Sequence, residues 1–182
     1  MAGFRGRQKH TVGKIARALP GRYGLARRQC GGEPGEQSIM AETITLGPLE
    51  LRFFYSKDET AGSLDMFEMT VQPNGRMPIP HYHESWDESI YGLTGKTTWR
   101  VDGRDIDLGP GETVFIKRGI VHGFTNRTQA PASCLCVLSP GVLGPQYFKD
   151  MAVLLSAATP DPARMKETML RYGLIPVPPS QA

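Results

Sequence analysis

The chain has 182 residues, of which 40% are hydrophobic and 21% are charged, so it can bury the core of one globular domain. No apolar run approaches the roughly 20 residues that a membrane helix needs, and three cysteines, Cys30, Cys134 and Cys136, are too few for a disulfide framework. We therefore expect a soluble, cytoplasmic domain with no membrane partner.

The formal charge of +3 is unevenly distributed along the chain. Residues 1–39 hold eight basic and two acidic residues, which leaves 13 of the 21 basic and 16 of the 18 acidic residues from position 40 onward. The body of the chain is therefore mildly acidic, and it lacks the basic patch that is typical of a nucleic-acid-binding surface. We expect no nucleic-acid partner.

Residues 1–39 are rich in Gly, Arg and Pro and show little periodic hydrophobicity, apart from a short helical pattern over 12–19. Such a segment buries too little apolar surface to offset its ordering entropy, which predicts a basic, flexible N-terminal arm. An anion-binding tail, a transit peptide and a twin-Arg export signal are alternatives, although the arm lacks the serines of the second and the apolar region of the third. The interpretation that we favour is an upstream extension of the reading frame, with the domain beginning at Met40.

Short strand patterns with turn residues between them follow from Met40. Pro78 and Pro80 place the segment before His81 at a barrel rim or sheet edge. Residues 92–95 are predicted to form a turn, and Asp102-Gly103 favours a tight hairpin. The spacing predicts an all-β sandwich or barrel over 40–140. The predicted strands are 42–46, 49–55, 64–71, 81–83, 88–93, 96–101, 104–108, 113–116, 122–126 and 133–138.

The pattern changes to helical over residues 141–182, which we expect to be a C-terminal helical extension and tail. Residues 145–156 place apolar side chains on one helical face. Asp161-Pro162 is a helix start, and Gly173 fits the end of that helix. The ending 176–179 is predicted to be an extended tail. The apolar faces would suit a lid, a dimer contact or packing on the outside of the barrel.

Three histidines and one glutamate form a candidate metal site. His81 and His83 are two residues apart, so on a strand their side chains share one face. Glu88 begins the next strand and could return beside them, and His122 supplies the third imidazole. This mixed nitrogen and oxygen set suits divalent Fe, Mn, Ni, Cu or Zn better than calcium or magnesium. Four protein ligands also leave a coordination position open, as catalytic sites do.

These residues carry a resemblance to a known family. The segment 75–95 resembles the first signature of the cupin superfamily: glycine, five residues, His-x-His, four residues, Glu, six residues and glycine. The segment 111–126 is similar to the second signature, with Lys117 where the family usually has proline; its matching positions are Gly111, Gly119, His122 and Asn126. The resemblance implies a double-stranded β-helix, the jelly-roll cupin barrel, with metal ligands at His81, His83, Glu88 and His122.

The resemblance to small quercetinase-like cupins implies a metal-dependent oxygenase, dioxygenase-like, that acts on a small organic molecule. Glu88 would then serve as the catalytic proton acceptor. Cupins are functionally diverse, so two alternatives stay open: a non-catalytic cupin that binds metal or a small ligand, and a metal-dependent isomerase or decarboxylase. A homodimer is expected because the faces and edges of a jelly roll usually need covering.

Several neighbouring residues have weaker predictions. Asp87 directly precedes Glu88 and could replace it as a ligand after a small shift. Trp86 is expected to pack or to line the rim. Strand parity makes Ile90 and Phe124 candidates for an apolar pocket wall. The alternating pair Cys134 and Cys136 is expected to lie on one face of a strand as two small buried side chains.

Overall fold

The structure is a computed structural model of the chain that describes residues 41–77 and 79–178. The predicted N-terminal arm, with its short helical pattern over 12–19, lies outside the described residues. No helix within the described ranges is both long enough and apolar enough to cross a membrane.

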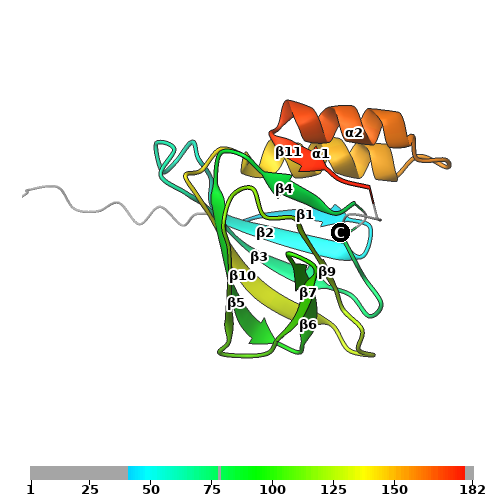
Figure 1. Cartoon of the computed structure of the whole chain (residues 1–182). Coiled ribbons are helices and arrows are strands. Elements are labelled where there is room, and N and C mark those ends of the chain that lie inside the picture. The colour runs from blue at the N-terminus through cyan, green and yellow to red at the C-terminus, as the bar shows by residue number, and fades with distance from the viewer. Residues whose placement is uncertain (1–40, 78, 179–182) are drawn as a thin grey trace, which may run out of the picture. The chain divides into compact units, whose positions relative to one another are not determined.

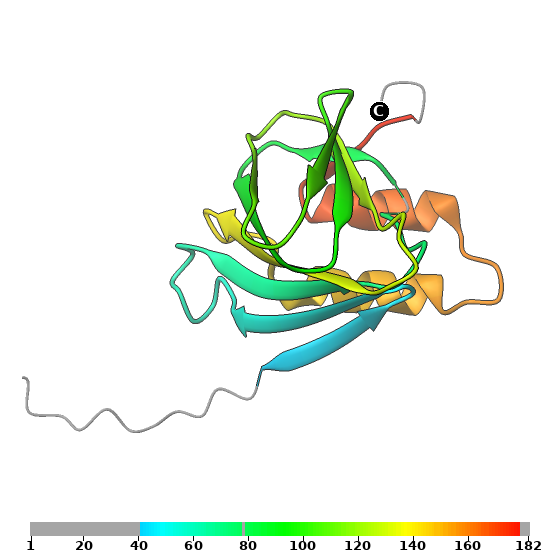
Figure 2. The same ribbon diagram turned by 90° about the horizontal axis from the view of Figure 1, so that it is seen from below.

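Two antiparallel sheets make up the domain, as Figures 1 and 2 show. The six-stranded sheet consists, in spatial order, of β1 (Glu42–Leu46), β2 (Leu49–Tyr55), β3 (Asp65–Val71), β10 (Ala132–Ser139), β5 (Asp87–Thr94) and β8 (Thr113–Ile116). The five-stranded sheet consists of β11 (Leu174–Pro176), β4 (His81–His83), β9 (His122–Thr125), β6 (Thr97–Val101) and β7 (Arg104–Leu108). The predicted all-β jelly-roll class with C-terminal helices is confirmed.

The core lies between the sheets because strand side chains alternate between the two faces. In β3, Phe67 and Met69 point inward, whereas Met66 and Glu68 between them are only half-buried. Phe67 stacks on Phe53 of β2 with ring centroids 4.8 Å apart, and such aromatic pairs bury large apolar areas. The alternation seen in the sequence therefore corresponds to the inner face of the sandwich.

Two helices, α1 (Gly144–Leu155) and α2 (Pro162–Arg171), lie along one side of the sheets, near β1 and β4 in Figure 1. The start predicted for α2 is confirmed, because the Asp161 side chain accepts hydrogen bonds from the backbone N–H groups of Ala163 and Arg164 at 2.9 and 3.3 Å. Phe148 of α1 packs on Phe67 with centroids 5.5 Å apart, so the apolar helix face covers the core between the sheets.

One local prediction was wrong, and one strand was not predicted. Residues 92–94 continue β5 instead of turning, and the turn begins only near Gly95, whose φ is +63°. Gly92 is needed for a different reason: a Cβ there would overlap the carbonyl oxygen of Gly109. Strand β11 was not predicted; it overlaps the expected extended tail only at Pro176 and pairs with β4 through a register that joins Leu174 to His83.

Candidate metal centre

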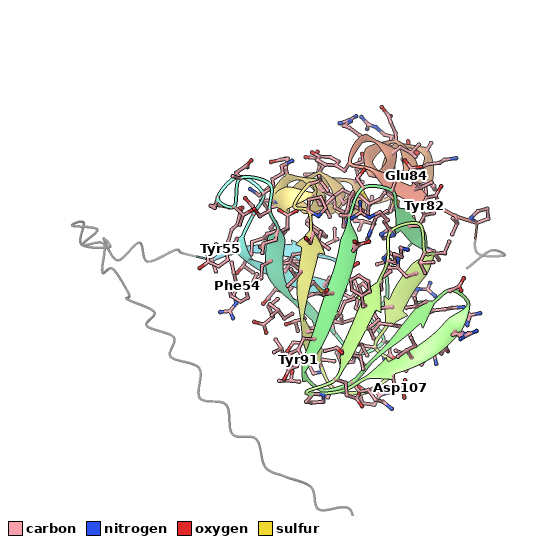
Figure 3. All side chains as sticks on the ribbon, turned by 60° about the vertical axis from the view of Figure 1, so that its left-hand side comes forward. Phe54, Tyr55, Tyr82, Glu84, Tyr91 and Asp107 are labelled. Carbon is pink, nitrogen blue, oxygen red and sulfur yellow. The ribbon has the colours of Figure 1, made fainter. Side chains whose placement is uncertain are left out.

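The three predicted histidines meet between two neighbouring strands. His81 and His83 share the inner face of β4, and His81 pairs in register with His122 of β9. All three are buried, and their possible ligand atoms lie within 4.8 Å of one another. Glu84, which follows His83, and Tyr82 between the two histidines are labelled in Figure 3; Glu84 is exposed and Tyr82 is half-buried.

Backbone carbonyls set the tautomers of two of the histidines. His81 Nδ1 lies 3.1 Å from the carbonyl oxygen of Ile79, and His122 Nδ1 lies 3.0 Å from that of Ile120. A carbonyl oxygen can only accept, so each Nδ1 must carry the proton and donate it. In the neutral form of each ring, Nε2 is then the unprotonated nitrogen and presents a lone pair, as in metal-binding histidines.

The spacing of the Nε2 atoms fits a bound cation. His81 Nε2 and His83 Nε2 are 3.0 Å apart, where two lone pairs repel unless a proton or a cation lies between them. Two nitrogens held at about 2.1 Å from one ion and at right angles would be about 3.0 Å apart. His122 Nε2 is a buried nitrogen with no hydrogen-bond partner, which a metal ion would supply. The buried triad is consistent with a metal site.

Glu88 brings a carboxylate to the same place from the other sheet. Its side chain is buried, and its Oε2 lies 3.4 Å from His122 Nε2 without forming a hydrogen bond. Three imidazole nitrogens from β4 and β9 thus form the candidate cluster, and the Glu88 carboxylate from β5 lies beside it. Such a donor set accepts the divalent transition metals from iron to zinc, and its ligands alone do not choose among them.

Residues 67–138 match the family model described as Cupin domain. This region is a cupin domain. Two curated relatives are quercetin 2,3-dioxygenase of Bacillus subtilis (strain 168), 33% identical over 79 residues, and tetracenomycin polyketide synthase protein TcmJ of Streptomyces glaucescens, 32% identical over 81 residues. The alignments cover 43% and 44% of this chain but only 23% and 52% of the relatives. The chain thus spans about a quarter and about half of their lengths.

A solved structure supports the fold. A predicted oxalate decarboxylase from Thermotoga maritima superposes with a TM-score of 0.51 and 23% identity, over 57% of this chain and 94% of that chain. The cupin resemblance of the two sequence segments is confirmed, and the match spans His81, His83, Glu88 and His122.

Burial keeps His81 and His83 uncharged. Loss of solvation, followed by the nearby His122 imidazole, lowers the pKa of His81 to about 3. Loss of solvation and the neighbouring His81 and His122 rings lower the pKa of His83 still further. Both rings are therefore neutral near pH 7, with lone pairs free to bind a cation.

Asp87 is committed to a different partner. Its carboxylate accepts hydrogen bonds from the Arg118 backbone N–H at 2.8 Å and from the guanidinium at 2.9 and 3.1 Å. These bonds lower the pKa of Asp87 to about 2. Asp87 is therefore paired with Arg118. Its position does not support the prediction that it could replace Glu88 as a metal ligand.

Trp86 and the cysteine pair are packing residues. Trp86 is buried, and its ring stacks on the His83 ring with centroids 4.4 Å apart and planes at 18°. Cys134 and Cys136 are both buried, with sulfurs 3.8 Å apart, as their alternation predicted. The contact with Cys134, together with burial, raises the pKa of the Cys136 thiol, so it stays protonated.

An apolar cavity adjoins the histidines. His81, His83 and Glu88 supply its polar side, and no Lys or Arg of the described ranges lines it. The empty space among the lining side chains is about 680 Å³, including the part that opens to solvent. The apolar and aromatic wall consists of Leu46, Leu49, Phe67, Met69, Met77, Ile79, Phe124, Cys136, Leu138, Leu143, Tyr147, Phe148, Met151, Met169 and Leu174.

The wall corrects one prediction and adds residues that the sequence did not assign. Phe124 lines the cavity as expected, whereas Ile90 is buried in the core and does not. Tyr147, Met151 and Met169 come from the two helices. The sequence showed that these helices have an apolar face, but it did not show that this face covers the cavity. The helices therefore complete the cavity, which makes them a cover for the site.

Proposed function

We propose that this cupin is a metal-dependent oxygenase, dioxygenase-like, that acts on a small, uncharged organic molecule. The observation that carries the proposal is the cluster of three buried imidazoles beside Glu88, of which His81, His83 and Glu88 form the polar side of an otherwise apolar cavity. His81, His83 and His122 would hold a divalent transition metal together with Glu88. When bound, such an ion supplies Lewis acidity and redox chemistry.

Glu88 is proposed to act as the proton acceptor. Its carboxylate lines the cavity beside the histidines, within reach of a hydroxyl or enol that enters from the apolar side. Removal of that proton turns the substrate into an electron-rich enolate, the form that reacts with dioxygen. The apolar wall excludes water, which strengthens the electrostatic contacts at the polar side.

The lining of the cavity favours one class of substrate. No cationic side chain of the described ranges faces the space, so a phosphate or carboxylate group would be buried there without a counter-charge. Aromatic walls such as Phe67, Phe124 and Phe148 suit a flat apolar molecule with one oxygen-bearing edge. Similarity to quercetin 2,3-dioxygenase over 79 residues supports a flavonol as the first probe. We propose that the protein binds neither nucleic acid nor a membrane.

Elemental analysis and oxygen uptake test this function together. We expect about one transition metal ion per purified chain and oxygen consumption with at least one member of a flavonol and β-diketone panel. Replacing a ligand by His83→Ala should remove the metal and the uptake. Glu88→Gln should lower the rate by about 100-fold or more because the proton acceptor is lost.

Asp87→Asn is the matched control for Glu88→Gln, because it makes the same chemical change at the adjacent position, where the carboxylate binds Arg118. Its rate should stay within about threefold of wild type. The proposal would be contradicted by protein that contains no metal when purified and binds none when metal is added. Oxygen uptake that survives His83→Ala would also contradict it. Turnover in the absence of oxygen would indicate the isomerase or decarboxylase alternative.

A further inference from the structure

His83 differs from the other two histidines in what holds its ring. His81 and His122 each donate Nδ1–H to a backbone carbonyl, whereas no hydrogen bond to Nδ1 of His83 is found within the described ranges. The Nε2 of His83 nevertheless points at Nε2 of His81, 3.0 Å away. Apart from this contact between the two Nε2 atoms, packing must therefore orient the ring.

The neighbour that contacts the ring face is Trp86. The two rings are stacked nearly in parallel, at 4.4 Å and 18°. Trp86 is 1% exposed, and its indole Nε1 is buried without a hydrogen-bond partner. No polar contact fixes the indole, so its position depends on the groups packed around it.

The group packed against the indole comes from the C-terminal segment. A Cβ built on Gly173 would lie 3.2 Å from the Trp86 ring, so the glycine backbone approaches the indole closely. Gly173 has φ +82° and lies between the end of α2 and the start of β11. In Figure 1, β11 runs beside β4, where Leu174 pairs with His83. Val177 N–H extends this contact by donating to the Pro80 carbonyl at 2.9 Å.

We propose that Trp86, backed by Gly173 and β11, positions His83 for metal binding. Trp86 is thus a positioning residue that acts through His83. The proposal rests on the metal site of the proposed function but not on the oxygenase reaction. It also assigns a role to residues 173–177, which lie outside the matched cupin region 67–138.

Titration of the chelator-treated full chain with Co²⁺ tests the role of the indole, because Co²⁺ affinity and visible absorption report ligand geometry without any substrate. Trp86→Leu removes the stacking face and should weaken Co²⁺ binding by about 10–100-fold, the usual effect of losing a group that orients a ligand. Its absorption spectrum should change, because His83 no longer holds its place. Trp86→Phe keeps a stacking ring and should bind Co²⁺ within about threefold of wild type.

Gly173→Ala tests the backing contact, with Gly111→Ala as its matched control. The two glycines have φ values of +82° and +83°, but a Cβ on Gly111 meets nothing within 4 Å. Both variants bear the same backbone strain, whereas only Gly173→Ala displaces the indole. We expect weaker Co²⁺ binding and an altered spectrum for Gly173→Ala alone.

Each outcome bears on the proposal. Wild-type affinity and spectrum in both Trp86→Leu and Gly173→Ala would overturn it while leaving the metal site intact. If Trp86→Leu does not fold, the glycine pair decides, and equal Co²⁺ binding by its two members would overturn the proposal. Wild-type protein that binds no Co²⁺ would overturn the metal site and this role with it.

Discussion

At the scale of single residues, the presentation of the imidazole nitrogens depends on groups that bind no metal. Two backbone carbonyls, those of Ile79 and Ile120, hold the protons of His81 and His122 on the far side of each ring. Burial then removes solvent from His81, so that its neutral imidazole is the favoured form. The site therefore keeps its lone pairs available at neutral pH.

The lowered pKa of His81 predicts an acid-sensitive fold. An unfolded histidine titrates at about pH 6.5, whereas folded His81 titrates with a pKa of about 3. Between these two pH values, His81 is protonated in the unfolded state and neutral in the folded state. The contribution of His81 to the free energy of unfolding is fully present above this pH range. It falls as pH decreases through the range, by up to about 1.4 kcal/mol per pH unit. Urea unfolding of chelator-treated protein near neutral pH and at about pH 5 measures the loss. His81→Gln should show a shallower dependence, and an identical slope would contradict the assignment.

At the scale of elements, helix α1 is attached to the sheets by a buried carboxylate. Asp65 of β3 accepts from the backbone N–H groups of Leu143 and Gly144 at 3.0 and 3.2 Å, and from that of Lys57 at 2.6 Å. An anionic side chain at a helix N-terminus satisfies otherwise unpaired N–H groups and complements the helix dipole. Asp65 thereby places Tyr147 and Met151 of the same helix in the cavity wall.

Asp65→Asn should detach this end of the helix. An amide has one accepting oxygen where the carboxylate has two, and its NH₂ group cannot accept. Asp65→Asn therefore leaves buried backbone N–H groups unpaired, which should lower the free energy of unfolding by about 3 kcal/mol. The same substitution at exposed Asp161, which begins the other helix, should cost well under about 1 kcal/mol because Asn is also a good N-cap. Urea denaturation of both variants measures the difference. Equal losses would show that the Asp65 contacts do not anchor the helix.

At the scale of the whole molecule, the outer face of the six-stranded sheet is the candidate surface for the expected homodimer. Phe115 of edge strand β8 is 64% exposed, and Tyr91 of β5, labelled in Figure 3, is 44% exposed. They line a shallow groove together with Leu135 and Val137 of β10. We propose that two copies pair across this face, because a two-fold contact would cover both the apolar groove and the strand edge.

Phe115→Glu should disrupt such a dimer by placing a charge in its centre. Light scattering after size-exclusion chromatography should give twice the chain mass for wild type and the chain mass for the variant. Val153→Glu, at a 72% exposed position on the helical side, is the control and should leave the mass unchanged. A monomeric wild type, or a Phe115→Glu variant that remains dimeric, would remove this face from consideration.

Local patterns carried much of the fold and of the histidine cluster. The two-residue spacing of His81 and His83 was enough to place both rings on one face, because strand side chains alternate whatever the strand pairs with. The Asp102-Gly103 hairpin was equally readable, and both residues have positive φ values, +49° and +71°. The predicted domain boundaries at 39 and 140 and the assignment of Glu88 as a ligand stay predictions.

The sequence by itself determined the alternation of the strands, the turns and the spacing of the metal-ligand candidates, because these depend on neighbours along the chain. Only the tertiary structure decided which side chains surround them. Asp87 meets Arg118 from 31 residues away, Gly92 makes room for a distant carbonyl, and β11 returns to pair with β4. The residues of the cavity wall could not be predicted either, because helix and strand residues become neighbours only when the sheets and helices pack. Local periodicity indicates which face of an element is buried, but not what covers that face.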